Sequence, residues 1–198
     1  MKIYYKLILS KISILILPVF IFLSFTGSSQ NDANYSIELV YQFINSTLTN
    51  DTLIFNLEEN TDLGIFTSDT MSILEDTLFN DEDRTYFRQQ FAMLGNVKWE
   101  AGKIIGATII SQDKVNNIFR RSFLKRIFRI NNGWKKFKRK YDGCLTSLSL
   151  PIFNVNQDYC IIYEWTQCHY LAGGGQLSVY HFENGEWIFL KAYSYGMS

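Results

Sequence analysis

Residues 159–193 read YCIIYEWTQCHYLAGGGQLSVYHFENGEWIFLKAY, and this stretch decides the fold of the last third of the chain. Side chains that alternate in character predict a strand at Tyr159–Trp165. The same alternation predicts further strands at Gln176–Phe182 and Trp187–Tyr193. Between these two stands Asn184-Gly185, a pair that favours tight hairpin turns because both residues tolerate a positive φ. The stretch therefore indicates an antiparallel meander.

Upstream of this stretch, Thr146–Asn154 supplies a fourth expected strand, and helical signals dominate everything before it. We therefore predict an α+β fold, with a mainly helical N-terminal two thirds packed on a C-terminal antiparallel β-meander of about four strands. The elements expected before the meander are a helix capped by Ser36 and ending near Thr47, a strand at Thr52–Leu57, helices capped by Asp69 and Asp81, a strand at Lys103–Ser111, and two basic helices separated by Asn131-Asn132-Gly133.

Residues 1–29 have the pattern of a secretory signal peptide. A lysine-containing start precedes the apolar run Ile12–Phe25, and small residues precede the expected cleavage point after Ser29. The run is shorter than the roughly 20 apolar residues of a transmembrane helix and contains Pro18. We expect cleavage to leave residues 30–198 as a single exported domain without a transmembrane segment, in the periplasm or outside the cell. Retention of the leader as an anchor is the alternative.

Charge is strongly segregated along the chain. The totals balance at 19 basic and 19 acidic residues, but residues 30–100 hold thirteen acidic and three basic ones, while Arg120–Lys140 holds ten basic and no acidic ones. Apolar residues at three- and four-residue spacing within the basic run predict an amphipathic helix with a basic outer face. The candidate binding residues on that face are Arg120, Arg121, Lys125 and Arg126.

Three interpretations of the basic run remain open. It is a solvated patch neutralised by the acidic half, a binding surface for an unknown protein or an anionic envelope component, or a nucleic-acid surface. The balanced overall charge and the expected export argue against nucleic acid. An aromatic content of 16% with only two prolines argues against disorder.

The last third of the chain carries a series of short motifs in a fixed order, namely Gly133-Trp134, Phe137, Lys140-Tyr141, Ser147–Asn154, Ile162-Tyr163, Cys168–Gly175 and Asn184-Gly-Glu-Trp187. Through these motifs and their order, residues 133–198 resemble a family of small exported bacterial proteins of unknown function. The resemblance implies no activity. The resemblance does imply a local disulfide between two cysteines four residues apart. That bridge cannot form here, because this chain has Cys168 at the first position and Ala172 at the second.

Three cysteines in an oxidising compartment leave one thiol without an internal partner. Cys144 and Cys168 both lie outside strand centres, so we favour a bridge between them. Cys160 lies in the middle of a strand and is expected to be a buried apolar residue. A zinc site needs about four clustered ligands, and the pair Cys168-His169 is isolated. We therefore expect neither a metal nor another cofactor.

A catalytic interpretation would make Cys168 a nucleophile activated by His169 or His181. Adjacent residues of an extended segment point to opposite faces, which weighs against the first pairing. The backbone amides of Gly173, Gly174 and Gly175 would supply an oxyanion site, or an anion-binding nest. Because strand alternation follows this run directly, we favour a flexible connection between two strands.

These observations favour a non-catalytic binding or structural protein of the cell envelope. No spaced acid–base pair and no cluster of metal ligands stands out in the sequence, whereas loops and a charged patch remain available for contacts. Two alternatives stay open. One is a hydrolase centred on Cys168 and the two histidines, and the other is an inhibitor or immunity-type protein that blocks a partner through its charged surfaces.

Overall fold

The computed structural model describes residues 36–48, 55–61, 73, 75–93, 97–120 and 132–195. All of them belong to one compact unit, Tyr35–Ser198. The predicted signal peptide, residues 1–29, lies outside the described residues, and so do residues 121–130, which hold most of the first predicted basic helix.

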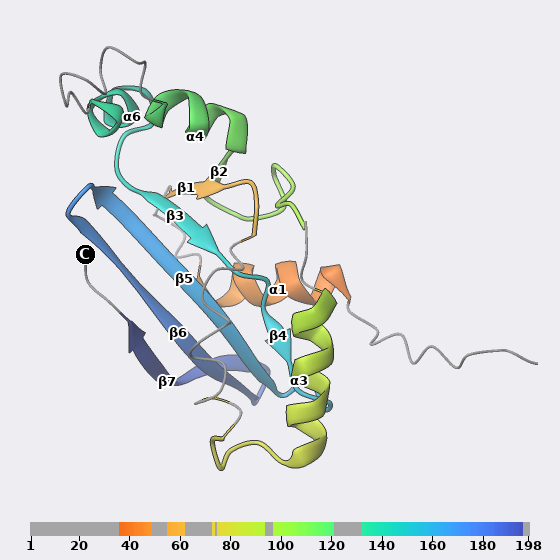
Figure 1. Ribbon diagram of the computed structural model, residues 1–198. Helices are drawn as coiled ribbons and strands as arrows, with labels where there is room; N and C mark the ends of the chain where they lie inside the picture. The colour runs from red at the N-terminus through yellow and green to blue at the C-terminus, as the bar shows by residue number, and fades with distance from the viewer. Residues whose placement is uncertain are drawn as a thin grey trace, which may run out of the picture. The chain divides into compact units, whose positions relative to one another are not determined.

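A seven-stranded mixed sheet organises this unit (Figure 1). The strand order is β2-β1-β3-β5-β6-β7. The remaining strand, β4, lies outside this order and pairs with β5. β1 runs parallel to both β2 and β3, whereas all other pairs are antiparallel. The strands are β1 (Phe55–Glu58), β2 (Ala107–Ile110), β3 (Leu145–Leu148), β4 (Ile152–Phe153), β5 (Tyr159–His169), β6 (Ala172–Glu183) and β7 (Glu186–Tyr195).

This sheet shows that the predicted fold class is wrong. The N-terminal half is not a helical layer packed on a separate meander, because β1 and β2 are themselves strands of the sheet. Both overlap segments that the sequence predicts as strands, Thr52–Leu57 and Lys103–Ser111, but their place in the same sheet as the meander was not predicted. Their parallel pairing also needs a long crossover, which here contains α3 (Asp81–Met93). Local periodicity carries no information about such a distant partner.

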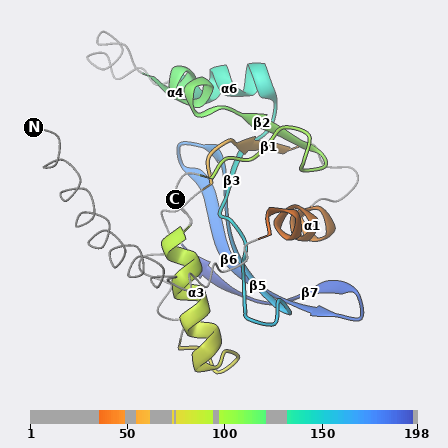
Figure 2. The ribbon, with the colours of Figure 1, turned by 90° about the vertical axis from the view of Figure 1, so that its right-hand side faces the viewer.

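Helices cover both faces of the sheet, with α1 (Ile37–Thr47) on one side and α3 on the other (Figure 2). We call them the α1 face and the α3 face. Along β5, Cys160, Ile162, Glu164 and Thr166 point to the α1 face, and Tyr159, Ile161, Tyr163 and Trp165 point to the α3 face. The centre of β5 is buried from Cys160 to Tyr163 because both faces are covered there.

The helix α1 begins and ends where the sequence predicts. The Ser36 hydroxyl accepts a hydrogen bond from the Leu39 N–H at 3.4 Å, which caps the first turn. Phe43 then anchors the helix on the α1 face, with its ring centroid 5.3 Å from that of Tyr180 and 5.2 Å from that of Trp187. Edge-to-face contacts of this kind add to the stabilisation from burial.

The helix α3 is present as predicted, but it begins at Asp81, the residue predicted as its cap, and Asn80 caps it instead. The Asn80 side chain accepts from the Asp83 N–H at 2.9 Å, and the Asp83 carboxylate accepts from the Asn80 N–H at 3.3 Å. This reciprocal arrangement is a capping box. Most of the helix predicted from Asp69 lies outside the described residues, and residues 75–79 form turns instead of its last part.

Gln90 of α3 explains why a polar residue is buried against the sheet. Its amide donates to the Phe153 carbonyl at 2.6 Å and accepts from the Phe153 N–H at 3.0 Å. The Gln90 side chain therefore satisfies the backbone N–H and C=O of Phe153 on the outer edge of β4, as a neighbouring strand would. The predicted strand Thr146–Asn154 is divided into β3 and β4, and between them Ser149 pairs with Tyr163 through its own N–H and hydroxyl.

The predicted flexible connection at Gly173, Gly174 and Gly175 is wrong, because these glycines lie inside β6. The turn consists of Tyr170 and Leu171 alone. A Cβ on Gly175 would lie 2.6 Å from the Trp165 ring, and one on Gly173 would lie 3.1 Å from it. These two positions need glycine because the Trp165 side chain of the neighbouring strand fills the space of a side chain there.

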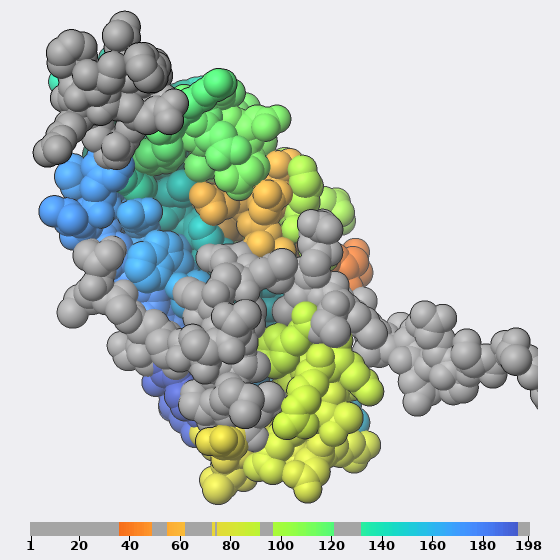
Figure 3. Space-filling view, viewed as in Figure 1, coloured from red at the N-terminus to blue at the C-terminus, as the bar shows by residue number. Residues whose placement is uncertain are grey.

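A second hydrophobic cluster lies at one end of the sheet, where α4 (Gln112–Phe119) and α6 (Gly133–Tyr141) meet. In the space-filling view, α4 (green) adjoins β1 (orange) on the surface (Figure 3). The α6 residues Trp134 and Phe137 are buried against Phe119 of α4. This cluster confirms the second predicted basic helix and holds it on the end of the sheet.

Candidate functional site

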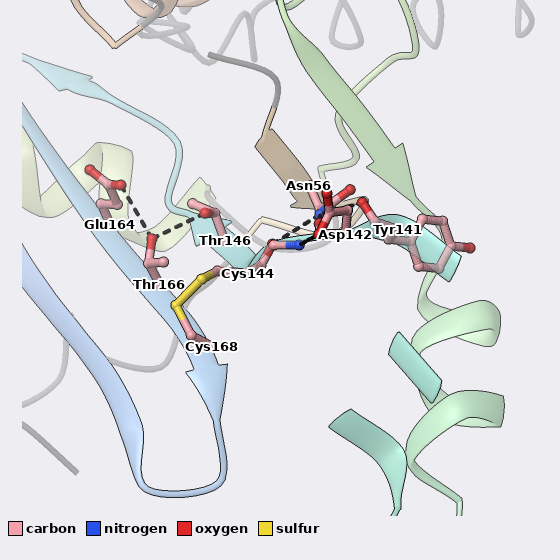
Figure 4. Close-up of a disulfide and its surroundings, with 9 residues drawn as sticks. Asn56, Tyr141, Asp142, Cys144, Thr146, Glu164, Thr166 and Cys168 are labelled. Atoms are coloured by element: carbon pink, nitrogen blue, oxygen red, sulfur yellow. Dashed lines mark hydrogen bonds between the residues drawn. A yellow bond between two sulfur atoms is a disulfide. The ribbon is translucent and has the colours of Figure 1, made fainter. Parts of the chain in front are cut away.

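The predicted nucleophile Cys168 is bonded to Cys144 in a disulfide, the pair that the sequence favoured (Figure 4). The bridge joins the residue before β3 to the end of β5. Cys160 is a buried free cysteine, and burial raises its pKa well above the usual value. A sulfur in a disulfide is not a thiolate, so Cys168 cannot attack a substrate in this state.

The two histidines lie at opposite ends of the β5–β6 hairpin. His169 is exposed beside the turn, where it pairs with Ala172. His181 pairs with Tyr159 at the other end, with ring centroids 4.5 Å apart. The residues of the hydrolase alternative are therefore not brought together. Among the described residues, no group of three or more His, Cys, Asp or Glu side chains is placed to hold a metal ion.

The basic run contributes one described helix surface. Arg120 is exposed at the C-cap of α4, whereas Arg121, Lys125 and Arg126 lie outside the described residues. The rest of the run is on α6, whose apolar side is buried. Its outer side, which we call the α6 basic surface, consists of Lys135, Lys136, Lys138, Arg139 and Lys140, all exposed except the half-buried Lys136.

Within the described part of the chain, the acidic half does not form ion pairs with the α6 basic surface. The ion pairs found there join Arg84 to Asp81, Lys98 to Glu59, and Lys191 to Asp76. Three of the α6 cations, Lys138, Arg139 and Lys140, are in the last helical turn, where they interact favourably with the helix dipole. The Lys140 Nζ also lies 5.2 Å from the centroid of the Tyr141 ring, and no ion pair found among the described residues neutralises these three charges.

A groove opens on the α1 face, beyond the C-terminal end of α1. It contains two adjoining cavities of about 320 and 260 Å³, which share Glu164 and Thr166. We call it the Glu164 groove. Its floor is formed by three neighbouring strands, because Thr146 of β3 pairs with Thr166 of β5, which pairs with Gly174 of β6. Leu48 and Phe55 form an apolar wall of the larger cavity.

A chain of hydrogen bonds crosses the floor of the groove (Figure 4). The hydroxyls of Thr146 and Thr166 are 3.0 Å apart, and the Thr166 hydroxyl donates to the Glu164 carboxylate at 3.4 Å. Burial raises the pKa of the Glu164 carboxyl, and the bond from Thr166 offsets this only in part. Glu164 is thus a half-buried acid with one long hydrogen bond to compensate its charge.

The rim of the groove is held by Asn56. Its amide donates to the carbonyls of Asp142 at 2.6 Å and Cys144 at 3.1 Å, immediately after α6 ends. Asp142 and Gly143 both have a positive φ and turn the chain from α6 into β3. The Asp142 carboxylate accepts from the Gly143 N–H at 2.9 Å. These contacts fix one carboxylate of the rim close to the disulfide.

Sequence reasoning did not identify this groove. One signal was present, because Glu164 is the only acidic residue of β5 and directly follows the apolar and aromatic run Tyr159–Tyr163. The other lining residues come from segments far apart in the chain, and only the fold brings Leu48, Asn56 and Asp142 to the same cavity.

No family model, curated protein or solved structure matched this chain in the comparisons. Among the described residues, no helix is both long enough and apolar enough to cross a bilayer.

Proposed function

We propose that this protein is an exported, non-catalytic binding protein of the cell envelope, and that the α6 basic surface binds an anionic envelope component. The observation that carries the proposal is the α6 basic surface itself. Five of the nine residues of α6 are basic, and its apolar side is committed to the end cluster through Trp134 and Phe137. The cations are thus presented on a packed, oriented helix.

Two further features support export and binding. A disulfide between Cys144 and Cys168 is typical of oxidising compartments outside the cytoplasm. The resemblance of residues 133–198 to small exported bacterial proteins agrees with the leader pattern of residues 1–29. The hydrolase alternative loses its nucleophile to the disulfide, and no contact among the described residues favours an inhibitor over a binder of an anionic surface.

The test is co-sedimentation of the domain, residues 30–198 with its disulfide intact, with phosphatidylglycerol vesicles and with neutral phosphatidylcholine vesicles. We expect binding to the anionic vesicles alone, and a decrease as salt screens the charges. The test variant carries Lys135→Gln, Lys138→Gln and Arg139→Gln together. Because each basic residue near an anionic surface contributes about 1 kcal/mol, its partitioning should fall on the order of a hundredfold.

A matched control removes the same charge elsewhere. Arg88→Gln, Lys103→Gln and Lys114→Gln change three exposed cations outside α6 and outside the end cluster's apolar contacts. This variant should bind nearly as well as the wild type. Equal loss in both triple variants would show that binding depends on net charge and not on α6. Binding that is unaffected by salt, or equal on both kinds of vesicle, would contradict the proposal.

A further inference from the structure

The floor of the Glu164 groove is open because residue 174 has no side chain. Gly174 lies between Gly173 and Gly175 but points to the opposite face of the sheet. A Cβ built on it would meet nothing within 4 Å, whereas its two neighbours face Trp165. Gly174 is also not among the glycines with a positive φ, so a residue with a side chain could adopt its backbone conformation. The empty space is therefore not forced by the backbone.

The polar side chains of the larger cavity present hydrogen-bond acceptors, whereas in the smaller cavity the Gln176 amide can both donate and accept. Thr166 has one hydroxyl hydrogen, which it directs to Glu164, so Thr146 must donate its own hydrogen to Thr166. The oxygens that remain available, on Thr146 and Glu164, are acceptors. On the rim, the Asn56 amide hydrogens are directed to main-chain carbonyls, and Asp142 carries a second carboxylate. A ligand rich in donors would complement these groups.

The electrostatics of the groove favour a cation. No Lys or Arg is found among the described residues that line either cavity, whereas two carboxylates, Glu164 and Asp142, line the larger one. The C-cap residues of two helices, Leu48 of α1 and Asp142 of α6, also lie in its wall. The C-terminal end of a helix carries a partial negative charge. The end of α1, which has no basic residue in its last turn, therefore adds to the attraction for a positive group, whereas the end of α6 already carries Lys138, Arg139 and Lys140.

We propose that the Glu164 groove is a binding site for a ligand with a protonated primary amine, which donates hydrogen bonds to the Glu164 carboxylate and the Thr146 hydroxyl. A primary ammonium has three donors and no acceptor, which matches the acceptors of the floor. The apolar wall of Leu48 and Phe55 would contact the aliphatic part of the ligand. This site is separate from the α6 basic surface, which attracts the opposite charge.

The ionisation of Glu164 agrees with such a ligand. Burial raises the pKa of its carboxyl in the free protein, because the charged form has little compensation there. A bound ammonium would supply the missing compensation and favour the carboxylate. Amine binding is thus expected to lower the pKa of Glu164, which NMR titration of the labelled side chain would detect.

The experiment measures binding of two matched pairs of probes by NMR titration of the domain, residues 30–198. One pair is Nα-acetyl-lysine amide and its Nε-acetylated form, and the other is glucosamine and N-acetylglucosamine. Within each pair, acetylation removes the charge and keeps most of the shape. We expect the amine of at least one pair to bind and its acetylated form to bind at least about tenfold more weakly, as for a charge-assisted hydrogen bond. The pair that binds more tightly distinguishes a flexible alkyl amine from an amino sugar.

Two variants test the site in different ways. Glu164→Gln should weaken amine binding at least about tenfold, because it removes the ionic partner. Gly174→Val should block the groove and keep the fold, since its side chain enters empty space in a strand that accommodates β-branched residues. The controls are Glu183→Gln, an exposed carboxylate near the far end of β6, and Ala192→Val, an exposed position on β7.

The possible outcomes separate clearly. Loss of amine binding in both groove variants, with binding retained in both controls, supports the site. Binding of the acetylated and free probes with equal affinity, binding of neither amine, or unchanged amine binding by folded Gly174→Val would overturn it. None of these outcomes depends on vesicle binding, so the α6 proposal and this one fail independently.

Discussion

The two faces of the β5–β6 hairpin differ sharply at its disulfide end. On the α3 face, Trp165 lies against Gly173 and Gly175, which have no room for a side chain. On the α1 face, Gly174 borders an open groove, where a methyl group on its Cα would have nothing within 4 Å. Three consecutive glycines thus serve two purposes, because successive residues of a strand point to opposite faces.

The carboxylates of the two faces differ in how their charge is compensated. On the α3 face, Asp76 accepts from Lys191 and Tyr193 of β7, and although burial acts to raise its pKa, these hydrogen bonds lower it to about 2. On the α1 face, the pKa of Glu164 is raised by burial, with one bond from Thr166 against it. The packed face compensates its charge internally, and the open face leaves that compensation to a ligand.

The largest expected effect comes from breaking the disulfide that fixes this end of both faces. Cys144→Ser with Cys168→Ser should lower the free energy of unfolding by about 3 kcal/mol, because the bridge closes a loop across 24 residues of separation. Urea unfolding with and without reductant measures it. Reductant should destabilise the wild type and Cys160→Ala alike, and should leave the double variant unchanged. If reductant did not change the unfolding free energy of the wild type, the disulfide would contribute nothing to the stability of the fold.

A smaller effect is expected from the packed face in acid. The folded-state pKa of Asp76 is depressed from 3.8 to about 2, so its stabilisation is present above pH 3.8 and is lost as the pH falls toward 2. Asp76→Asn should cost about 1 kcal/mol at neutral pH, after allowance for solvent screening. Unfolding free energies measured across this range should converge in acid. A constant difference would show that the carboxylate's charge is not involved.

The smallest effect should have the opposite sign and come from the open face. The folded-state pKa of Glu164 is raised, so ionisation of this group disfavours the folded state as the pH rises through that value. Glu164→Gln should therefore raise the thermal midpoint slightly at neutral pH, with the gain disappearing in acid. A loss of stability at neutral pH would mean that the carboxylate is a structural group and would weaken its assignment to a ligand.

The sequence predicted the features that depend on neighbouring residues. The ends of α1 follow from Ser36 and the apolar spacing, and Asn184 and Gly185 have the positive φ that a tight turn requires. The parallel pairing of β1 with β2 was not predictable, because it joins short segments across a long crossover. The glycine run was misinterpreted for a related reason, since the space above Gly175 is filled by Trp165 of another strand.

The groove could not be predicted because no continuous segment contains it. Leu48 ends a helix, Asn56 is in a parallel strand, and Glu164 is half-buried in β5, directly after the buried centre of that strand. Their proximity depends on the mixed sheet that the sequence did not reveal. Glu164, the single acidic residue of β5, was the available local signal, and it does not identify the residues that surround it in the fold.

The most direct test of the difference between the two faces is the free energy of unfolding of Gly174→Ala and Gly175→Ala, measured side by side in urea. Gly175→Ala should lose about 2 kcal/mol, because its methyl group would overlap the Trp165 ring and the Glu164 carbonyl. Gly174→Ala should match the wild type or gain up to about 0.5 kcal/mol, because alanine loses less backbone entropy on folding. Equal losses, or a larger loss at residue 174, would contradict the account of one filled face and one open face.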